Sequence, residues 1–120
     1  MAKKDAVVFD LNNTLRKKSG EPRRHILDKA QKDIKKENVV VISGESSKDQ
    51  REARSWLDTH GLKKSELDMR PQGDTEADDR EKAGILDRMV SRQFKVKKAY
   101  DDKSSNVKMF KKHGIKAKKV

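Results

Sequence analysis

The fold is decided by a stretch near the amino terminus, AVVFDLNNTL at residues 6–15. Four apolar residues lead to Asp10 and the chain turns polar soon afterwards, which is typical of a buried strand in a parallel sheet. Such a strand delivers Asp10 to its carboxyl end, the edge of an open α/β sheet at which ligands bind. The stretch therefore predicts an α/β fold with a functional carboxylate at a strand end.

Later stretches of the chain repeat the alternation of strand and helix, although residues 67–70 have little apolar content. The predicted strands are residues 39–42, 67–70, 96–100 and, as a short edge strand, 115–117. The predicted helices begin near Arg23, at Ser46 or Ser47, at Asp78 or Asp79, and at Ser104 or Ser105. Because strands that alternate with helices form a parallel sheet covered on both faces, we expect a three-layer Rossmann-like α/β fold with about five parallel strands.

The composition indicates one small domain spanning residues 1–120. Charged residues make up 42% and hydrophobic residues 32%, but the apolar residues gather in blocks, which indicates a folded core under a charged surface. The absence of cysteine excludes disulfides and thiolate metal sites. No run approaches the ~20 apolar residues of a membrane span. We therefore expect a soluble, cytoplasmic protein that does not bind a membrane.

The charge of the chain points to a polyanionic partner. Lys and Arg number 31 against 20 Asp and Glu, a net charge of +11, which favours nucleic acid. A lysine-rich surface that keeps a small protein soluble explains the same charge equally well. Residues 16–22 are basic and contain Gly and Pro, so they are expected to form an exposed loop. No obligate protein partner is evident.

Polar residues follow the predicted strands in a particular order. They are Asp10 with Asn12 and Thr14, then Ser43 with Gly44, then Lys82 at the start of a helix, then Asp101 with Asp102. Each signal is weak alone, because an Asp after a strand is usually a turn residue and a helix Lys is usually solvated. Response regulators carry a similar set but begin with the acid pair. Here the pair comes last, which disfavours that relation.

This order resembles the four signatures of the haloacid dehalogenase (HAD) superfamily, the first of which is Asp-x-Asp-x-Thr. Residues 69–82, MRPQGDTEADDREK, are similar to the segment before the lysine in the 3′-phosphatase domain of phage polynucleotide kinases, and residues 99–115 continue the likeness. The resemblance spans nearly the whole chain. It implies a HAD fold, capless or with a minimal cap at residues 16–22, and phosphomonoester hydrolysis at 3′-phosphorylated ends in DNA or RNA repair.

The resemblance also implies a role for each residue. Asp10 would attack phosphorus and form an aspartyl-phosphate. Mg²⁺ would be bound by Asp10, the backbone carbonyl of Asn12 and Asp101, with Asp102 in support. Ser43, Gly44 or Thr14 would contact phosphate oxygens. Lys82 would pair with phosphate and with Asp10. The residues implied to position the substrate and Lys82 are Arg70, Asp74 and Asp78.

Asn12 departs from the pattern, since the family has its second aspartate there, as the general acid and base. An amide can do neither, so metal and phosphate binding should persist while turnover falls. Three hypotheses fit: a natural binder or slow enzyme, an active enzyme that uses another acid, or an active parent altered to trap a bound state. The third is favoured because the change is isosteric and isolated.

A second departure is Glu45, where the phage enzymes have an arginine; Lys48 or Arg51 could supply the missing charge. Two rival functions therefore remain. One is a catalytically silent nucleic-acid-binding module, which Asn12 and Glu45 support. The other is a phosphatase for free nucleotides or other small molecules, which the missing cap disfavours because small substrates need enclosure. Nucleic-acid binding is expected to weaken steeply with salt, and neutralising Lys17, Lys18, Arg23 and Arg24 together is expected to flatten that dependence.

Overall fold

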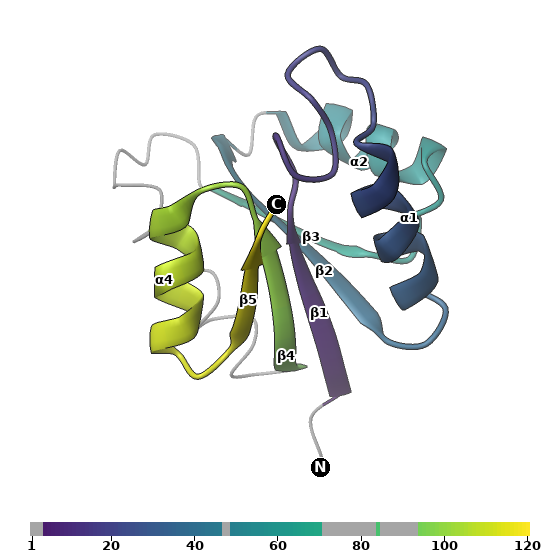
Figure 1. The fold of residues 1–120 in the computed structure, drawn as a ribbon. Coiled ribbons are helices and arrows are strands. Elements are labelled where there is room, and N and C mark those ends of the chain that lie inside the picture. Colours follow the sequence, from purple (N-terminus) through teal and green to yellow (C-terminus); the bar gives the residue numbers. More distant parts are fainter. Residues whose placement is uncertain (1–3, 47–48, 71–83, 85–93) are drawn as a thin grey trace.

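The computed structural model describes residues 4–46, 49–70, 84 and 94–120. Within these residues, five parallel strands form one sheet in the order β3-β2-β1-β4-β5 (Figure 1). The strands are β1 (Lys4–Asp10), β2 (Asn38–Ser46), β3 (Glu66–Arg70), β4 (Phe94–Asp101) and β5 (Lys116–Lys119).

Helices cover both faces of the sheet. They are α1 (Arg24–Asp33), α2 (Gln50–Thr59) and α4 (Ser104–Lys112). Alternate side chains of β1 enter two separate cores, as expected for a strand buried on both faces. The helices α1 and α2 lie on one face of the sheet and α4 on the other (Figure 1). Phe9 packs with Leu27 and Leu57 in the first core, whereas Val8 packs with Phe110 in the second. The three-layer α/β fold is thus confirmed.

The order of the strands reverses at β1. The chain builds β2 and β3 on one side of β1 and then returns to place β4 and β5 on the other side. In such sheets, ligands bind outside the carboxyl ends of the strands at the point of reversal. Asp10 pairs with Ile42, and Phe9 pairs with Tyr100, so Asp10 and Asp101 end neighbouring strands. The topology therefore brings these two acids to one crevice.

The structure corrects the predicted end of the second strand. Instead of turning at Ser43 and Gly44, β2 continues to Ser46 because its pairing with β3 resumes after a register shift, with Ser46 opposite Arg70. Ser46 therefore does not cap the next helix. The N-cap of α2 is Asp49, and its side chain makes no capping hydrogen bond.

Two other element boundaries differ from the prediction. Ser104 is the first residue of α4 and Lys103 is its N-cap, because β4 ends at Asp101 and leaves only a two-residue link. The edge strand β5 spans Lys116–Lys119, so its lysines lie within the strand, where parallel pairing with β4 continues to its end. The helix predicted from Asp78 or Asp79 falls outside the described residues except at position 84, which is helical.

The connection from β1 to α1 is residues 11–23, which contain no helix or strand beyond two isolated bridges. This connection agrees with the expectation of a minimal cap at this point. Among the residues that the structure describes, no helix has the length and apolar character needed to cross a membrane.

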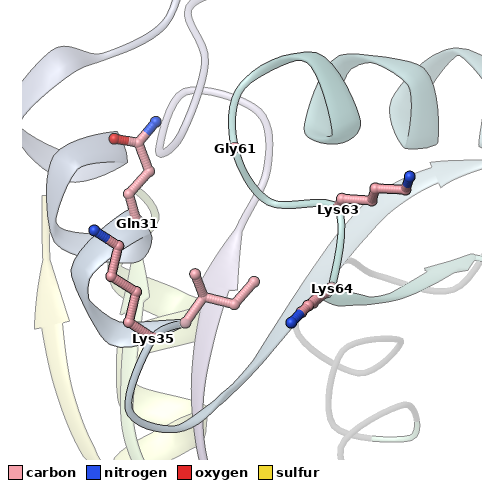
Figure 2. Close-up of a pocket in the computed structure, with 6 residues that line it drawn as sticks. Gln31, Lys35, Gly61, Lys63 and Lys64 are labelled. Carbon is pink, nitrogen blue, oxygen red and sulfur yellow. The ribbon is translucent and has the colours of Figure 1, made fainter.

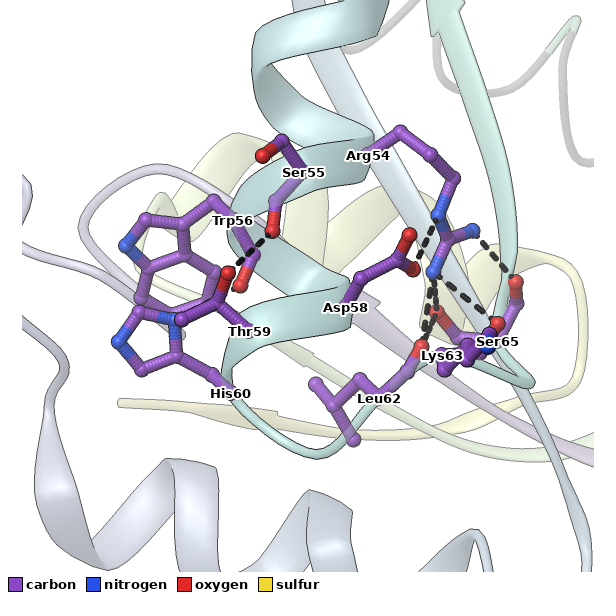
Figure 3. A network of polar contacts seen from close by, with 9 residues as sticks. All are labelled: Arg54, Ser55, Trp56, Asp58, Thr59, His60, Leu62, Lys63 and Ser65. Carbon is purple, nitrogen blue, oxygen red and sulfur yellow. Dashed lines mark hydrogen bonds and ion pairs between the residues drawn. The ribbon is translucent and has the colours of Figure 1, made fainter.

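The turn between α2 and β3 is held by Arg54 (Figure 3). Its guanidinium donates hydrogen bonds to the backbone oxygens of Leu62 at 2.8 Å and Ser65 at 2.7 Å, and pairs with Asp58 at 3.0 Å. Gly61 begins this turn with a φ of 79°, a left-handed conformation that glycine adopts without strain. Arg54 therefore stabilises the backbone that leads into β3.

Replacing Arg54 with Met should lower the free energy of unfolding by about 1–3 kcal/mol, because the Ser65 carbonyl would lose the Arg54 donor and the Asp58 carboxylate would lose its ion pair, while the aliphatic stem is kept. The Leu62 carbonyl would keep the backbone N–H and the hydroxyl of Ser65 as donors. Urea denaturation measures this change. Arg51→Met, at an exposed position on the same helix, is the matched control. Equal effects of the two substitutions would contradict the role assigned to Arg54.

Candidate active site

A tight turn follows β1 and positions the first group of site residues. The backbone N–H groups of Leu15 and Arg16 both donate to the carbonyl oxygen of Leu11, at 3.0 and 3.1 Å. Asn13 adopts a φ of 64°, in the left-handed region that Asn tolerates better than most residues. The turn therefore folds the chain back on itself directly after Asp10.

This turn places the hydroxyl of Thr14 against the carboxylate of Asp10. Thr14 Oγ1 donates to Asp10 Oδ2 at 2.9 Å, and both residues are buried, with Asp10 only 4% exposed. A hydroxyl has a single proton to donate. In this arrangement Thr14 therefore orients Asp10. The resemblance implied a hydrogen bond to phosphate from Thr14 or Ser43, and Ser43 is the one that remains available for it.

Three carboxylates meet at the ends of β1 and β4. Oxygen atoms of Asp10, Asp101 and Asp102 all lie within 4.8 Å of one another. Asp101 is fully buried, and its Oδ1 accepts hydrogen bonds from the backbone N–H of Lys103 at 3.0 Å and from Asn106 Nδ2 at 3.2 Å. Two buried carboxylates and the half-buried Asp102 at this separation favour a bound cation, and oxygen ligands suit Mg²⁺. The donor set therefore fits the implied metal.

Ser43 lies beside the nucleophile candidate on the neighbouring strand. It directly follows Ile42, the residue that pairs with Asp10, and it is fully buried. Its Oγ accepts a hydrogen bond from the backbone N–H of Glu45 at 3.1 Å. A hydroxyl that accepts in this way keeps its proton for another acceptor, such as a phosphate oxygen. Gly44 continues β2 next to it.

The expectation that residue 16 lies in an exposed loop is wrong. Arg16 is only 6% exposed, because the turn after β1 brings its guanidinium over the side chain of Asn12 and beside helix α2. Arg16 Nε donates to Asn12 Oδ1 at 2.9 Å, and Nη1 pairs with Glu52 at 2.8 Å. The burial of Arg16 was not predicted from the sequence, because a charged residue is usually exposed. Residues 17–20 are exposed as predicted.

Glu45 completes this cluster. Its Oε1 accepts a hydrogen bond from Asn12 Nδ2 at 2.5 Å, and its Oε2 lies 3.7 Å from Arg16 Nη2. Among the described residues, the cation beside Glu45 is thus Arg16. That Lys48 or Arg51 supplies the missing charge toward substrate stays a prediction. Arg51 is exposed, and Lys48 lies outside the described residues.

Trp56 anchors the loop that carries the exposed basic residues. Its Nε1 donates to the carbonyl oxygen of Gly20 at 2.8 Å, and the guanidinium of Arg16 lies 5.7 Å from the centre of its ring. The ring also stacks on His60, with 4.0 Å between ring centres (Figure 3). These contacts connect the β1–α1 loop to α2.

The other expected site residues are Arg70, Asp74, Asp78 and Lys82. Arg70 ends β3 and its backbone pairs with Ser46. Asp74, Asp78 and Lys82 lie outside the described residues.

A hollow of about 670 Å³ lies elsewhere, between the end of α1 and the turn after α2 (Figure 2). It is lined by Gln31, Ile34, Lys35, Gly61, Lys63 and Lys64. The turn after α2 leads into the amino end of β3, so this hollow belongs to the opposite edge of the sheet from Asp10. It contains none of the carboxylates described above.

Comparison with known proteins gives a family match and a fold match. The model of the HAD family described as "Polynucleotide kinase PNKP phosphatase domain" matches residues 2–120. A chain in the "Structure of the Pnkp1/Rnl/Hen1 RNA repair complex" is similar with a TM-score of 0.89 and 19% identity, over 98% of this chain and 42% of that one. A chain in the "Structure of Pnkp1/Rnl/Hen1 complex" is similar with a TM-score of 0.91 and 17% identity, over 100% of this chain and 47% of that one. The present chain thus spans less than half the length of either chain, and at these identities the likeness concerns the fold.

Proposed function

Because the chain belongs to the family of polynucleotide kinase phosphatase domains within the HAD superfamily, we propose that it is a magnesium-dependent phosphomonoesterase acting on 3′-phosphorylated ends of nucleic acid. The observation that carries this proposal is the meeting of Asp10, Asp101 and Asp102 at neighbouring strand ends, with carboxylate oxygens within 4.8 Å of one another. Asp10 can serve as nucleophile and, together with the other two acids, hold a cation.

The reaction has two halves, and both use Asp10. In the first, a carboxylate oxygen of Asp10 attacks phosphorus, the bond from phosphorus to the 3′ oxygen breaks, and that oxygen takes up a proton to become a hydroxyl. In the second, water hydrolyses the aspartyl-phosphate, which releases inorganic phosphate and restores the carboxylate. Thr14 orients Asp10 for the attack through its 2.9 Å hydrogen bond.

The charge that develops on phosphate needs partners. Ser43 is placed to donate its hydroxyl proton to a phosphate oxygen, with Gly44 allowing close approach of the backbone, and Lys82 is the proposed cation on the opposite side. Mg²⁺ held by Asp10, Asp101, Asp102 and the carbonyl of Asn12 would neutralise charge on phosphate when bound. Arg70, Asp74 and Asp78 are proposed to position the substrate and Lys82.

Asn12 limits this chemistry in the chain as it stands. The residue at position 12 would protonate the leaving 3′ oxygen and then activate the hydrolytic water, and an amide does neither. Substrate binding and metal binding do not need a carboxylate there. We therefore propose a site that binds substrate normally and turns over slowly.

A polymer is the substrate that the surroundings of the site favour. Residues 11–23 form only a short connection beside the carboxyl edge of the sheet, so that side of the site is open to a long molecule. Lys17, Lys18 and Arg24 are exposed on this connection and at the start of α1, where they can contact backbone phosphates. The description of one similar structure as an RNA repair complex supports an RNA end as one substrate. Both similar chains are described in complexes, so protein partners are a further proposal for this chain.

The role of the metal is tested by Asp101→Ala. This substitution removes a direct ligand, so Mg²⁺ affinity measured by calorimetry should fall at least tenfold, in the range seen when ligation is disturbed. Asp68→Ala, on β3 outside the carboxylate cluster, is the control. Undiminished affinity in Asp101→Ala would contradict the assignment of Asp101.

The proposal that the substrate is a polymer is tested by the salt dependence of binding to a single-stranded oligonucleotide. Each phosphate contact should contribute about −0.7 to the slope of log K against log salt concentration, so neutralising Lys17, Lys18 and Arg24 together to Gln should flatten the slope. Arg23 is left intact because its Nη1 donates to the carbonyl oxygen of Asn13 at 2.6 Å and supports the turn.

The matched control neutralises Lys35, Lys63 and Lys64, three lysines at the opposite edge of the sheet (Figure 2). This triple variant should keep the original slope. If both triple variants lose the same slope, binding is a property of net charge and the placement of the polymer at the Asp10 edge is wrong.

A nucleic-acid-binding module without catalysis is the second candidate, because Asn12 and Glu45 both depart from the pattern of active relatives. Phosphate release by the Asn12→Asp variant distinguishes the two functions. An active variant supports the phosphatase, and an inactive variant that still binds oligonucleotide supports the module.

A further inference from the structure

We propose that Asn12 and Glu45 form a matched amide–carboxylate pair, in which Glu45 positions the side chain of residue 12 and disfavours a carboxylate there. This inference rests on the proposed function for its catalytic meaning, but the pair itself is defined by contacts. Asn12 Nδ2 donates to Glu45 Oε1, and Asn12 Oδ1 accepts from Arg16 Nε at 2.9 Å. Both ends of the amide therefore have a partner of the right kind.

The identity of each atom in this contact matters. Only the N–H₂ group of an amide can donate to the carboxylate of Glu45, and only its oxygen can accept from Arg16. The amide of Asn12 is therefore held in one orientation by two neighbours from different segments, the turn after β1 and the end of β2. A carboxylate at position 12 would keep the contact to Arg16 and would lose the contact to Glu45.

The charges around Arg16 make this loss more costly. Arg16 is 6% exposed and already pairs with two carboxylates, Glu45 at 3.7 Å and Glu52 at 2.8 Å. A third carboxylate at position 12 would give three negative charges around one guanidinium, two of them in direct contact. The side chains of Glu45 and Glu52 are 37% and 62% exposed, so water screens part of this repulsion, and most of the cost falls on the contact between residues 12 and 45.

The pair also bears on the origin of Asn12. If Asn12 were a single substitution in an active parent with Asp at position 12, the residue at position 45 would be unrelated to the new amide. A carboxylate that accepts a hydrogen bond from that amide would then be unexplained. The 2.5 Å contact between Asn12 and Glu45 instead matches both departures from the pattern to each other. This contact favours the hypothesis that Asn12 is the native residue of this protein.

Reversing the pair should keep the contact and move the carboxylate. In the double variant Asn12→Asp/Glu45→Gln, the amide of residue 45 donates to the carboxylate of residue 12, and the number of charges around Arg16 is unchanged. The carboxylate then stands at position 12, where the proposed function needs a general acid and base. Misplacement of a catalytic group by about 1 Å can cost ~10²-fold in rate, so a correctly held carboxylate should be much more active than a repelled one.

The test is a double-mutant cycle with two separate measurements. In thermal unfolding, Asn12→Asp should lower the melting temperature by roughly 3–6 °C, and Glu45→Gln should change it less. The double variant should have nearly the melting temperature of the parent. Phosphate release from para-nitrophenyl phosphate with Mg²⁺ should be at least about tenfold faster in the double variant than in Asn12→Asp. Asn12→Asp/Glu66→Gln, with the second change at an exposed residue of β3, is the control and should behave like Asn12→Asp alone.

The two measurements separate failure of the pair from failure of the proposed function. Additive changes in melting temperature around the cycle, with no restoration in the double variant, would overturn the pair whatever the activity. Restored stability in a series that releases no phosphate from any substrate would support the pair and overturn the phosphatase.

Discussion

Asp10→Asn, made in the Asn12→Asp background, is expected to lower phosphate release from para-nitrophenyl phosphate by roughly 10⁴-fold or more, the scale on which enzymes lose a covalent nucleophile. An amide oxygen does not attack phosphorus, so no aspartyl-phosphate can form. The change is isosteric, and the amide oxygen can still accept the hydrogen bond that Thr14 Oγ1 donates at 2.9 Å. The loss should therefore be chemical, with the domain still folded.

Asp5→Asn is the matched control, because Asp5 lies on the same strand and is exposed near its other end. It should leave the rate unchanged. Mass spectrometry of acid-quenched reactions adds a second measurement, since a phosphoryl group should be found on the peptide that contains Asp10 and be missing in Asp10→Asn. Comparable rates with and without the Asp10 carboxylate would show that another group is the nucleophile.

Asn12→Asp is expected to raise turnover by about 10²–10⁴-fold, the usual contribution of a general acid and base. The increase should lie toward the lower end while Glu45 remains, since Glu45 would repel the new carboxylate. Magnesium affinity should change little, because the proposed contact of residue 12 with the metal is its backbone carbonyl. Steady-state phosphate release and calorimetry on the two proteins measure these quantities.

The pH dependence distinguishes this gain from a structural effect. A general acid and base introduced at position 12 should give kcat a pH profile that the unmodified chain lacks. Asn13→Asp, one residue later on an exposed part of the turn, controls for added charge and should give no such gain. If the unmodified chain already matches the Asn12→Asp rate, another residue supplies the acid and Asn12 is no impairment.

The alternation of apolar runs and helical segments was enough to predict the fold class and the convergence of Asp10 with Asp101. Each acid directly follows a predicted strand, and carboxyl ends of parallel strands meet at one edge whatever the exact bounds of the strands. The prediction therefore survived errors of several residues, such as the continuation of β2 to Ser46.

Contacts that depend on tertiary placement were not predictable in the same way. Arg16 stands among lysines, so its sequence context indicates solvent, and only the turn around Leu11 brings it under cover beside Asn12. Glu45 meets Asn12 only because β2 runs past Ser43, a consequence of its pairing with β3. Ser46 and Ser104 have the residue type of N-caps, but strand pairing and a short link decided where α2 and α4 begin.

The proposed phosphatase activity is tested by inorganic phosphate release from a 3′-phosphorylated oligonucleotide, measured with Mg²⁺ for the unmodified chain and for Asn12→Asp. Two further substrates are measured separately for comparison: the same oligonucleotide with a 5′-phosphate, and a nucleoside 3′-monophosphate. We expect Mg²⁺-dependent release from the 3′-phosphorylated oligonucleotide that is much faster in Asn12→Asp, with far less release from the other two substrates. Equal processing of the nucleoside 3′-monophosphate, or no release by Asn12→Asp from any of the three, would contradict the proposed function.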